Sequence, residues 1–101
     1  MRRLSITSVC VLQAIAGGYQ YGFDIIDQTQ LPSGTVYPAL GRLERDGLVK
    51  SAWENEQDAH TEGRPARRYY KLTAPGVTAL SEAASFYRAL LPAGKSRPVR
   101  G

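Results

Sequence analysis

The sequence predicts a mainly α-helical fold with one small β-hairpin. Apolar residues recur at helical spacing in three segments before residue 47 and in one segment after residue 73. Between them the pattern changes to the alternation that is typical of strands. With 101 residues, of which 43% are apolar, the chain is long enough for one small domain with a thin core.

The first predicted helix, residues 5–16, is apolar on almost every side. Only Thr7, Ser8 and Gln13 interrupt the run, and the Gly-Gly pair at 17–18 ends it. A helix that is apolar all round is covered all round. In so small a domain, we expect part of that cover to come from a second subunit.

Two shorter helices follow. The second is predicted over residues 21–29, with Phe23, Ile25 and Ile26 facing inward, and Pro32 prevents its continuation. Ser33 is expected to cap a third helix over residues 33–46, which Gly47 ends. On a helical wheel, the core-facing residues of this third helix are Val36, Leu40 and Leu43.

The opposite side of the third helix is small at its start and basic towards its end. Small side chains let a helix approach a DNA groove, its first amides bind phosphate, and arginine reads guanine edges or grips the backbone. The alternative is that Arg42 and Arg45 are ordinary solvated charges, diluted by Glu44 and Asp46. The residues on this side are Gly34, Thr35, Pro38, Arg42 and Arg45, with Tyr37 on the flank.

Two strands are predicted over residues 48–54 and 67–73, joined by a polar loop over 55–66. Basic residues gather at the second strand, where alternation separates Tyr70 and Leu72 from the face that carries Tyr69. We expect these basic residues, at the base of the hairpin, to touch DNA. The acidic tip of the loop would instead repel phosphate. A strand edge protected by charge is the alternative. The basic residues are Arg64, Arg67, Arg68 and Lys71, and the acidic ones are Glu54, Glu56, Asp58 and Glu62.

A last helix is predicted over residues 74–92, capped by Thr73 and with Pro75 in its first turn. It carries two apolar stripes, one for its own domain and one for a partner, although both could instead pack within one domain. A symmetric dimer predicts a palindromic operator. The first stripe is Val77, Leu80, Ala84, Tyr87 and Leu91, which with Val9 and Leu12 forms the predicted dimer contact; the second is Ala79, Ala83, Phe86 and Leu90.

Three helices, a hairpin and a further helix follow one another in the order of a winged helix-turn-helix domain. We therefore divide the chain into a winged helix-turn-helix domain (1–73), a dimerisation helix (74–92) and a flexible basic tail (93–101).

Charge and composition narrow the function. The net charge is +4, and ten of the thirteen basic residues are arginine, which favours an anionic partner. The single cysteine, Cys10, excludes an internal disulfide and is expected to be a buried, inert thiol. We find no pattern typical of a signal peptide or a membrane span and expect a cytoplasmic protein.

No catalytic pattern is present. His60 is the only histidine, and with Asp58 and Glu62 it would make at most a weak chelate in a solvated loop. No glycine-rich phosphate loop is present either. We expect no enzyme activity, no metal and no cofactor. No effector is assignable, and Trp53 is expected to pack across the hairpin against a tyrosine.

Three motifs resemble the PadR-like transcriptional regulators: "YGFDII", "SGTVYPALGRLERDGLV" and "EGRPARRYYKLTAPG". The resemblance is to the compact branch of that family with a single C-terminal helix. It implies a dimeric DNA-binding repressor whose third helices enter successive major grooves of double-stranded DNA. It further implies that wing arginines touch the DNA backbone and that four residues lie at the DNA surface: Ser33, Thr35, Tyr37 and Pro38. A winged-helix module that binds protein instead of specific DNA is the rival hypothesis.

Overall fold

The computed structural model describes residues 4–90, over which five helices and one antiparallel hairpin follow one another. This confirms the predicted fold class. In order, the elements are α1 (Ile6–Ala16), α2 (Gly22–Thr29), α3 (Ser33–Arg45), β1 (Val49–Trp53), α4 (Glu56–Thr61), β2 (Arg68–Leu72) and α5 (Ala74–Leu90).

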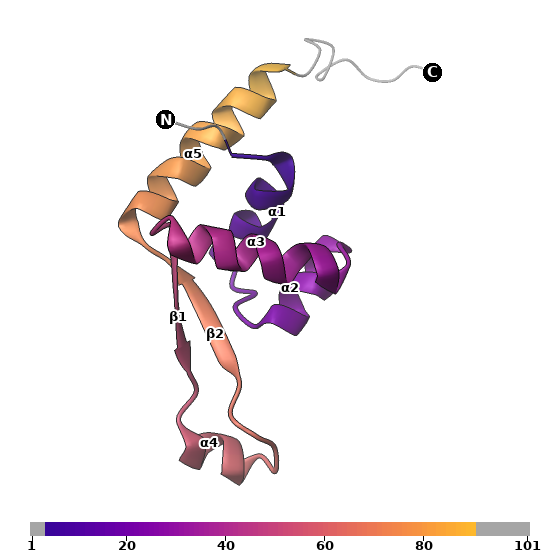
Figure 1. Cartoon of the computed structure of the whole chain (residues 1–101), viewed down its shortest axis with the longest axis vertical. Helices are drawn as coiled ribbons and strands as arrows, with labels where there is room; N and C mark the ends of the chain where they lie inside the picture. The colour runs from indigo at the N-terminus through magenta and orange to yellow at the C-terminus, as the bar shows by residue number, and fades with distance from the viewer. Residues whose placement is uncertain (1–3, 91–101) are drawn as a thin grey trace.

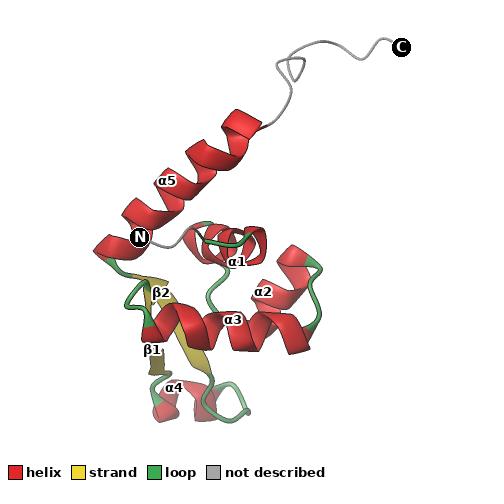
Figure 2. Cartoon of the chain, turned by 45° about the horizontal axis from the view of Figure 1, so that its top comes forward, coloured by secondary structure: helices red, strands yellow, loops and turns green. Residues whose placement is uncertain are grey.

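The helices and the hairpin are arranged around α3 (Figures 1 and 2). Helix α3 crosses in front of α1 and α2, and the hairpin runs away from them with α4 at its far end. Helix α5 leaves in the opposite direction, alongside α1. Val36, Leu40 and Leu43 of α3 are buried as predicted, against Leu12 of α1 and Ile25 of α2. The core therefore lies behind α3 and leaves its other side open.

Helix α1 is covered on one side by its own chain. Val11, Leu12 and Ile15 are buried, whereas Ile6 and Cys10 are exposed. The prediction of a buried Cys10 thiol is therefore wrong for the single chain, because α1 presents Cys10 away from α2, α3 and α5.

The inward side of α2 differs from the prediction at one residue. Phe23 is 73% exposed, while Gly22 and Ile25 are buried. At 100° per residue, Phe23 lies about 130° from the centre of the stripe formed by Gly22, Ile25 and Thr29. The helical periodicity of α2 therefore places Phe23 outside the core, although its side chain is apolar.

The start of α3 is shifted by one residue from the prediction. Pro32, in extended conformation (φ −66°, ψ 153°), precedes the first helical residue, Ser33, and makes no side-chain capping bond. The Pro32 carbonyl instead accepts from the N–H groups of Thr35 and Val36 (2.9 and 3.0 Å). Ser33 is thus inside the helix and is not its cap. The predicted end is confirmed, since Gly47 has a φ of +77°.

The hairpin pairs Val49 with Leu72 and continues in register to Trp53 with Arg68. Trp53 therefore faces Arg68, whose guanidinium lies 6.0 Å from the indole centroid, rather than a tyrosine. A further bridge joins Tyr21 to Tyr69. This bridge attaches the segment before α2 to the outer edge of β2.

The loop predicted over residues 55–66 contains a helix, α4. Asn55 caps it by accepting from the N–H groups of Gln57 and Asp58 (2.7 and 3.2 Å). Acidic residues in the first turn favour a helix start, and Gly63, with a φ of +73°, follows its end. An N-cap residue followed by acids was the sequence signal for this helix.

Helix α5 begins as predicted. The hydroxyl of Thr73 accepts from the N–H of Gly76 (3.0 Å) and donates to the carbonyl of Gly47 (2.6 Å). Leu80 packs against the core, and the Tyr87 hydroxyl donates to the carbonyl of Leu4 (2.7 Å). The predicted partner stripe therefore packs in part on its own domain. Leu91 and the tail 93–101 lie outside the described residues.

Candidate nucleic-acid interface

The open side of α3 is the first part of the candidate interface. Its exposed residues, which we call the α3 surface, are Ser33, Gly34, Tyr37, Pro38, Gly41, Arg42 and Arg45. Six of these seven were predicted, and Thr35, also predicted, is half-buried beside them. Gly41 was missed, although it follows Pro38 by three residues on the same side of the helix.

The chemistry of the α3 surface changes along the helix. At its start, Gly34 leaves open space, with no heavy atom within 4 Å of where a Cβ would lie, and Gly41 does the same one turn from the end. Arg42 and Arg45 lie in the last turn, where they also complement the helix dipole. A smooth start and a basic end allow close approach to a groove together with contacts to bases or phosphates.

The wing, defined here as residues 49–72 (β1, α4, β2 and the loops between them), differs more from the prediction. In the sequence, no acidic residue lies among the three arginines of the wing. In the folded chain, however, each of them lies close to a glutamate. Arg64 pairs with Glu54 and Glu62, and Arg67 lies 3.8 Å from Glu54 through its Nε. Arg68 pairs with Glu44 of α3 at 3.3 Å.

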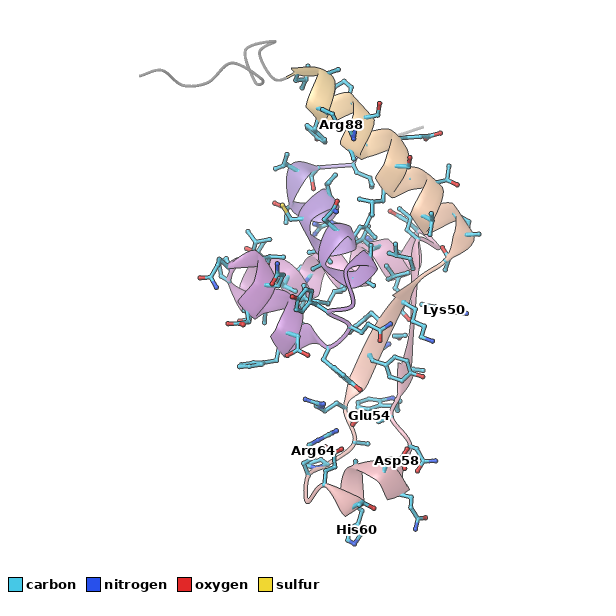
Figure 3. The ribbon with its side chains drawn as sticks, turned by 180° about the vertical axis from the view of Figure 1, so that it is seen from behind. Lys50, Glu54, Asp58, His60, Arg64 and Arg88 are labelled. Carbon is cyan, nitrogen blue, oxygen red and sulfur yellow. The ribbon has the colours of Figure 1, made fainter. Side chains whose placement is uncertain are left out.

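Glu54 is the centre of this network at the junction of hairpin and α4, where Figure 3 places it beside Arg64. Its side chain is 12% exposed and accepts from Arg64 Nη2 (3.0 Å), the Tyr21 hydroxyl (2.8 Å) and the N–H of Arg67 (2.9 Å). The hydrogen bond from Arg64, more than those from Tyr21 and Arg67, lowers the pKa of Glu54 to about 2. The same bond raises the pKa of Arg64 above its usual range. Glu54 thus ties the wing to the start of α2.

A second network joins the wing to α3. Ser51 of β1 donates to Glu44 Oε2 (2.7 Å) and accepts from Arg68 Nε (3.0 Å), while Arg68 Nη2 reaches Glu44 Oε1 (3.3 Å). Three side chains from α3, β1 and β2 therefore fix the hairpin against the end of α3. Sequence reasoning treated Glu44 only as a charge that dilutes its neighbours.

Two lysines remain exposed on the hairpin. Lys71 was predicted, and Lys50, which was missed, lies directly opposite it across the two strands. Their faces point away from the core, because Val49, Tyr70 and Leu72 occupy the other face. Like charges placed opposite each other disfavour the strand pair, and an anion relieves this repulsion.

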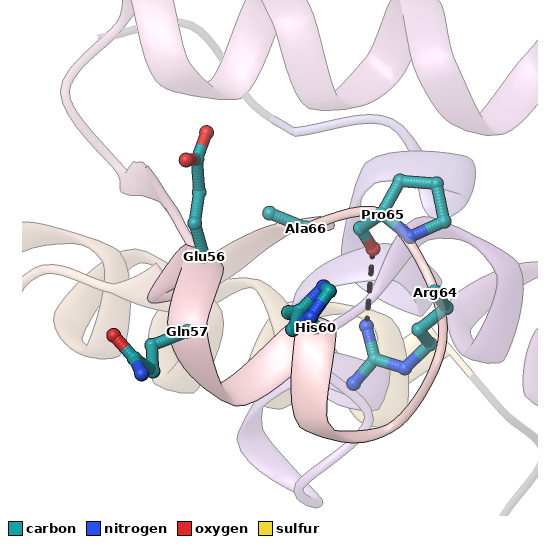
Figure 4. Close-up of a pocket in the computed structure, with 6 residues that line it drawn as sticks. All are labelled: Glu56, Gln57, His60, Arg64, Pro65 and Ala66. Atoms are coloured by element: carbon teal, nitrogen blue, oxygen red, sulfur yellow. Dashed lines mark hydrogen bonds between the residues drawn. The ribbon is translucent and has the colours of Figure 1, made fainter.

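The far end of the wing is acidic and holds a shallow hollow (Figure 4). The hollow has a volume of about 580 Å³ and is lined by Glu56, Gln57, His60, Arg64, Pro65 and Ala66. Arg64 is already engaged there, since it reaches the Pro65 carbonyl (3.4 Å) as well as Glu54. Among residues 4–90, no cluster of histidine, cysteine or carboxylate side chains is arranged to hold a metal ion.

The residues predicted for dimerisation differ in how far their own chain buries them. Leu12 is 0% exposed in the core of its own chain, so the single chain does not present it at the surface, and Leu80 also packs on the core. Val77 is 55% exposed. Val9, Ala84 and Tyr87 are half-buried, and Leu91 lies outside the described part of the chain.

Acid should weaken the fold through Glu54. A carboxylate with a depressed pKa stabilises the folded state above its unfolded pKa, ordinarily about 4.3, and this contribution disappears as the pH falls through the folded value of about 2. We therefore expect the urea midpoint of the wild-type protein to fall more steeply between pH 5 and pH 2 than that of Glu54→Gln. Parallel curves for the two proteins would contradict this role of Glu54.

No helix in the described residues is long and apolar enough to cross a membrane.

Comparisons with known proteins agree with the arrangement of helices and hairpin described above. The family described as "Transcriptional regulator PadR-like family" matches residues 11–82, which is more than half of the chain. A comparison with curated proteins gave no match.

Solved structures with the same fold include other regulators of this family. A PadR family transcription regulator from Clostridium difficile is 28% identical, with a TM-score of 0.74 over 85% of this chain and 91% of that one. A PadR-like transcription factor from Bacteroides fragilis is 29% identical (TM-score 0.70; 84% and 82% covered), and a PadR-like regulator from Bacillus cereus is 22% identical (TM-score 0.69; 84% of both). The resemblance seen in the sequence motifs is confirmed, and the chain belongs to the PadR-like family of transcription regulators, whose members are not enzymes.

Proposed function

We propose that this regulator binds a specific double-stranded operator as a homodimer and acts as a cytoplasmic repressor. The observation that carries the proposal is the α3 surface, where a smooth, exposed helix start and two exposed arginines follow one another on the side away from the core. This arrangement suits a helix that enters a major groove and contacts bases with residues near its own two ends.

The wing contributes differently from the α3 surface. Arg64, Arg67 and Arg68 are engaged by Glu54, Glu62 and Glu44, so DNA phosphates would have to compete with these carboxylates. Lys50 and Lys71 are exposed and stand opposite each other. We propose that these lysines supply the wing's main attraction to the DNA backbone, while the arginines hold the wing in place.

Selection of duplexes from a random pool tests the function. The purified protein should enrich an inverted repeat at both low and near-physiological salt, and the spacing of the half-sites should correspond to whole turns of DNA. Binding that disappears with salt and enriches no sequence would leave only counterion-driven contact. The rival hypothesis of a protein-binding module would then be preferred.

Arg42→Ala should weaken binding to the selected duplex by about 1–3 kcal/mol if Arg42 reads a base. Arg88→Ala is the matched control, because it removes one exposed arginine from α5, away from the α3 surface. Affinities measured by fluorescence anisotropy for the selected and a scrambled duplex separate the two roles of Arg42. Equal losses on both duplexes indicate a phosphate contact, and no loss removes Arg42 from the interface.

The proposed dimer uses the uncovered apolar residues of α5 and α1. Val77 and Leu90 of α5 and Ile6 of α1 are each more than half exposed, so their burial against a partner would be favourable. Helices α1 and α5 also lie alongside each other, so both can contribute to one contact.

Val77→Asp should shift the protein towards monomers in sedimentation velocity, because it places a charge in the proposed apolar contact. Thr78→Asp adds the same charge at the exposed neighbouring position of α5 and serves as the control. Val77 is preferred to Leu80 for this experiment, since Leu80 supports its own domain. A Val77→Asp protein that sediments like the wild type would place the interface elsewhere.

A further inference from the structure

Gly22, the first residue of α2, has no conformational reason to be glycine. The glycines with positive φ in the described chain are Gly18, Gly47 and Gly63, and Gly22 is not among them. A glycine within a helix costs roughly 0.5–1 kcal/mol relative to alanine. The reason for glycine at this position must therefore be space.

The space at Gly22 is occupied by the ring of Tyr37. A Cβ on Gly22 would lie 2.5 Å from the Tyr37 hydroxyl oxygen, 2.6 Å from Cε1 and 2.8 Å from Cζ. Gly22 is buried under this ring, whereas Tyr37 itself is 49% exposed and belongs to the α3 surface. The hydroxyl end of the Tyr37 side chain thus lies directly against the start of α2.

The backbone around Gly22 is fixed on the side of the wing. The backbone carbonyl of Gln20 accepts from the N–H of Tyr70 (2.9 Å), and Tyr21 forms a β-bridge with Tyr69 and donates through its hydroxyl to Glu54. Ile25, one turn later, is fully buried. An added methyl group at Gly22 would therefore displace the terminal atoms of the Tyr37 side chain more easily than the backbone.

We propose that Gly22 is a positioning residue for DNA recognition: its missing side chain holds the Tyr37 ring and hydroxyl in the place where they meet the operator. This inference rests on the proposed function and deepens it. A tyrosine whose hydroxyl end is held against the backbone of α2 presents its hydroxyl to a phosphate or a base edge in one defined orientation. The specificity of the α3 surface then depends on a residue of α2 that itself is buried.

A double-mutant cycle of Gly22→Ala and Tyr37→Ala tests the proposal. Gly22→Ala should weaken binding to the selected duplex by roughly fivefold or more, but should change affinity by less than about twofold in the Tyr37→Ala background. Gly17→Ala is the control, because a Cβ there meets only ordinary contacts of 3.5 Å or more, outside the α3 surface. Equal effects of Gly22→Ala in both backgrounds would overturn the proposal.

The position of the ring is read independently in the free protein by NMR of ¹³C-labelled tyrosine. Gly22→Ala should shift the ring signal of Tyr37 more than those of the other five tyrosines, with a thermal melt recorded to verify folding. An unmoved Tyr37 signal, or a moved signal with unchanged DNA affinity, overturns the positioning role while leaving the DNA-binding function intact. If the wild-type protein enriches no duplex, the proposed function fails and this inference fails with it.

Discussion

Replacing Leu12 with alanine should lower the free energy of unfolding by about 2–5 kcal/mol. Leu12 is 0% exposed and packs among residues of α2, α3 and the hairpin, so its truncation leaves a cavity in the core. Urea unfolding, followed by circular dichroism, measures the loss. Gln13→Ala, at the exposed neighbouring position, is the control and should stay within about 0.5 kcal/mol of the wild type.

The concentration dependence of this loss distinguishes the two places that Leu12 can occupy. A core residue changes unfolding equally at low and high protein concentration, whereas an interface residue acts through dimerisation, which depends on concentration. If Leu12→Ala shifted the protein to monomers without a loss that persists at both concentrations, the original prediction of Leu12 as an interface residue would stand.

Gly76→Ala should lower the free energy of unfolding by about 3 kcal/mol, at the upper end of what overpacking usually costs. A Cβ at this position would overlap the carbonyl oxygen of Leu48 and lie 2.9 Å from its carbonyl carbon. Both groups are backbone, and the Leu48 carbonyl already accepts from the N–H of Thr73 (3.1 Å). Relief of the overlap therefore requires α5 to move away from the hairpin.

Gly41→Ala, a substitution in α3, should have the opposite effect on stability from Gly76→Ala in α5. No heavy atom lies within 4 Å of a Cβ at Gly41, so the substitution should raise the free energy of unfolding by about 0.5–1 kcal/mol through its helix propensity. Thermal melts of the two variants should therefore move in opposite directions. A stabilised Gly76→Ala protein would contradict the close approach of α5 to Leu48.

Local patterns predicted the elements that positioned the α3 surface. Val36, Leu40 and Leu43 repeat at helical spacing and mark the buried side of α3. Arg42 and Arg45 fall on the opposite side, which is therefore exposed. Gly47 and Thr73 act on their immediate neighbours, so their roles as helix end and helix cap were also predictable. Each of these signals lies within one turn of the residue it controls.

Contacts between distant segments were not predictable from such patterns. Glu54 meets Tyr21 across 33 residues, and Arg68 meets Glu44 across 24, so the segment "RPARRYYKL" seemed free of acids when read alone. Leu12 fits both a core and an interface by hydrophobicity, and only the placement of α3 and the hairpin decides between them. The reason for glycine at position 22 was likewise not predictable, because it depends on contact with a tyrosine fifteen residues later in the sequence.

The two networks at Glu54 and Glu44 have a consequence for the thermodynamics of association. They join the hairpin to α2 at one point and to α3 at another, so the angle between wing and α3 is set in the free protein. Conformational entropy that a loose wing would lose on reaching DNA is lost already during folding. In the proposed complex with DNA, the carboxylates that weaken the wing's charge would therefore also lower the entropic cost of docking the wing.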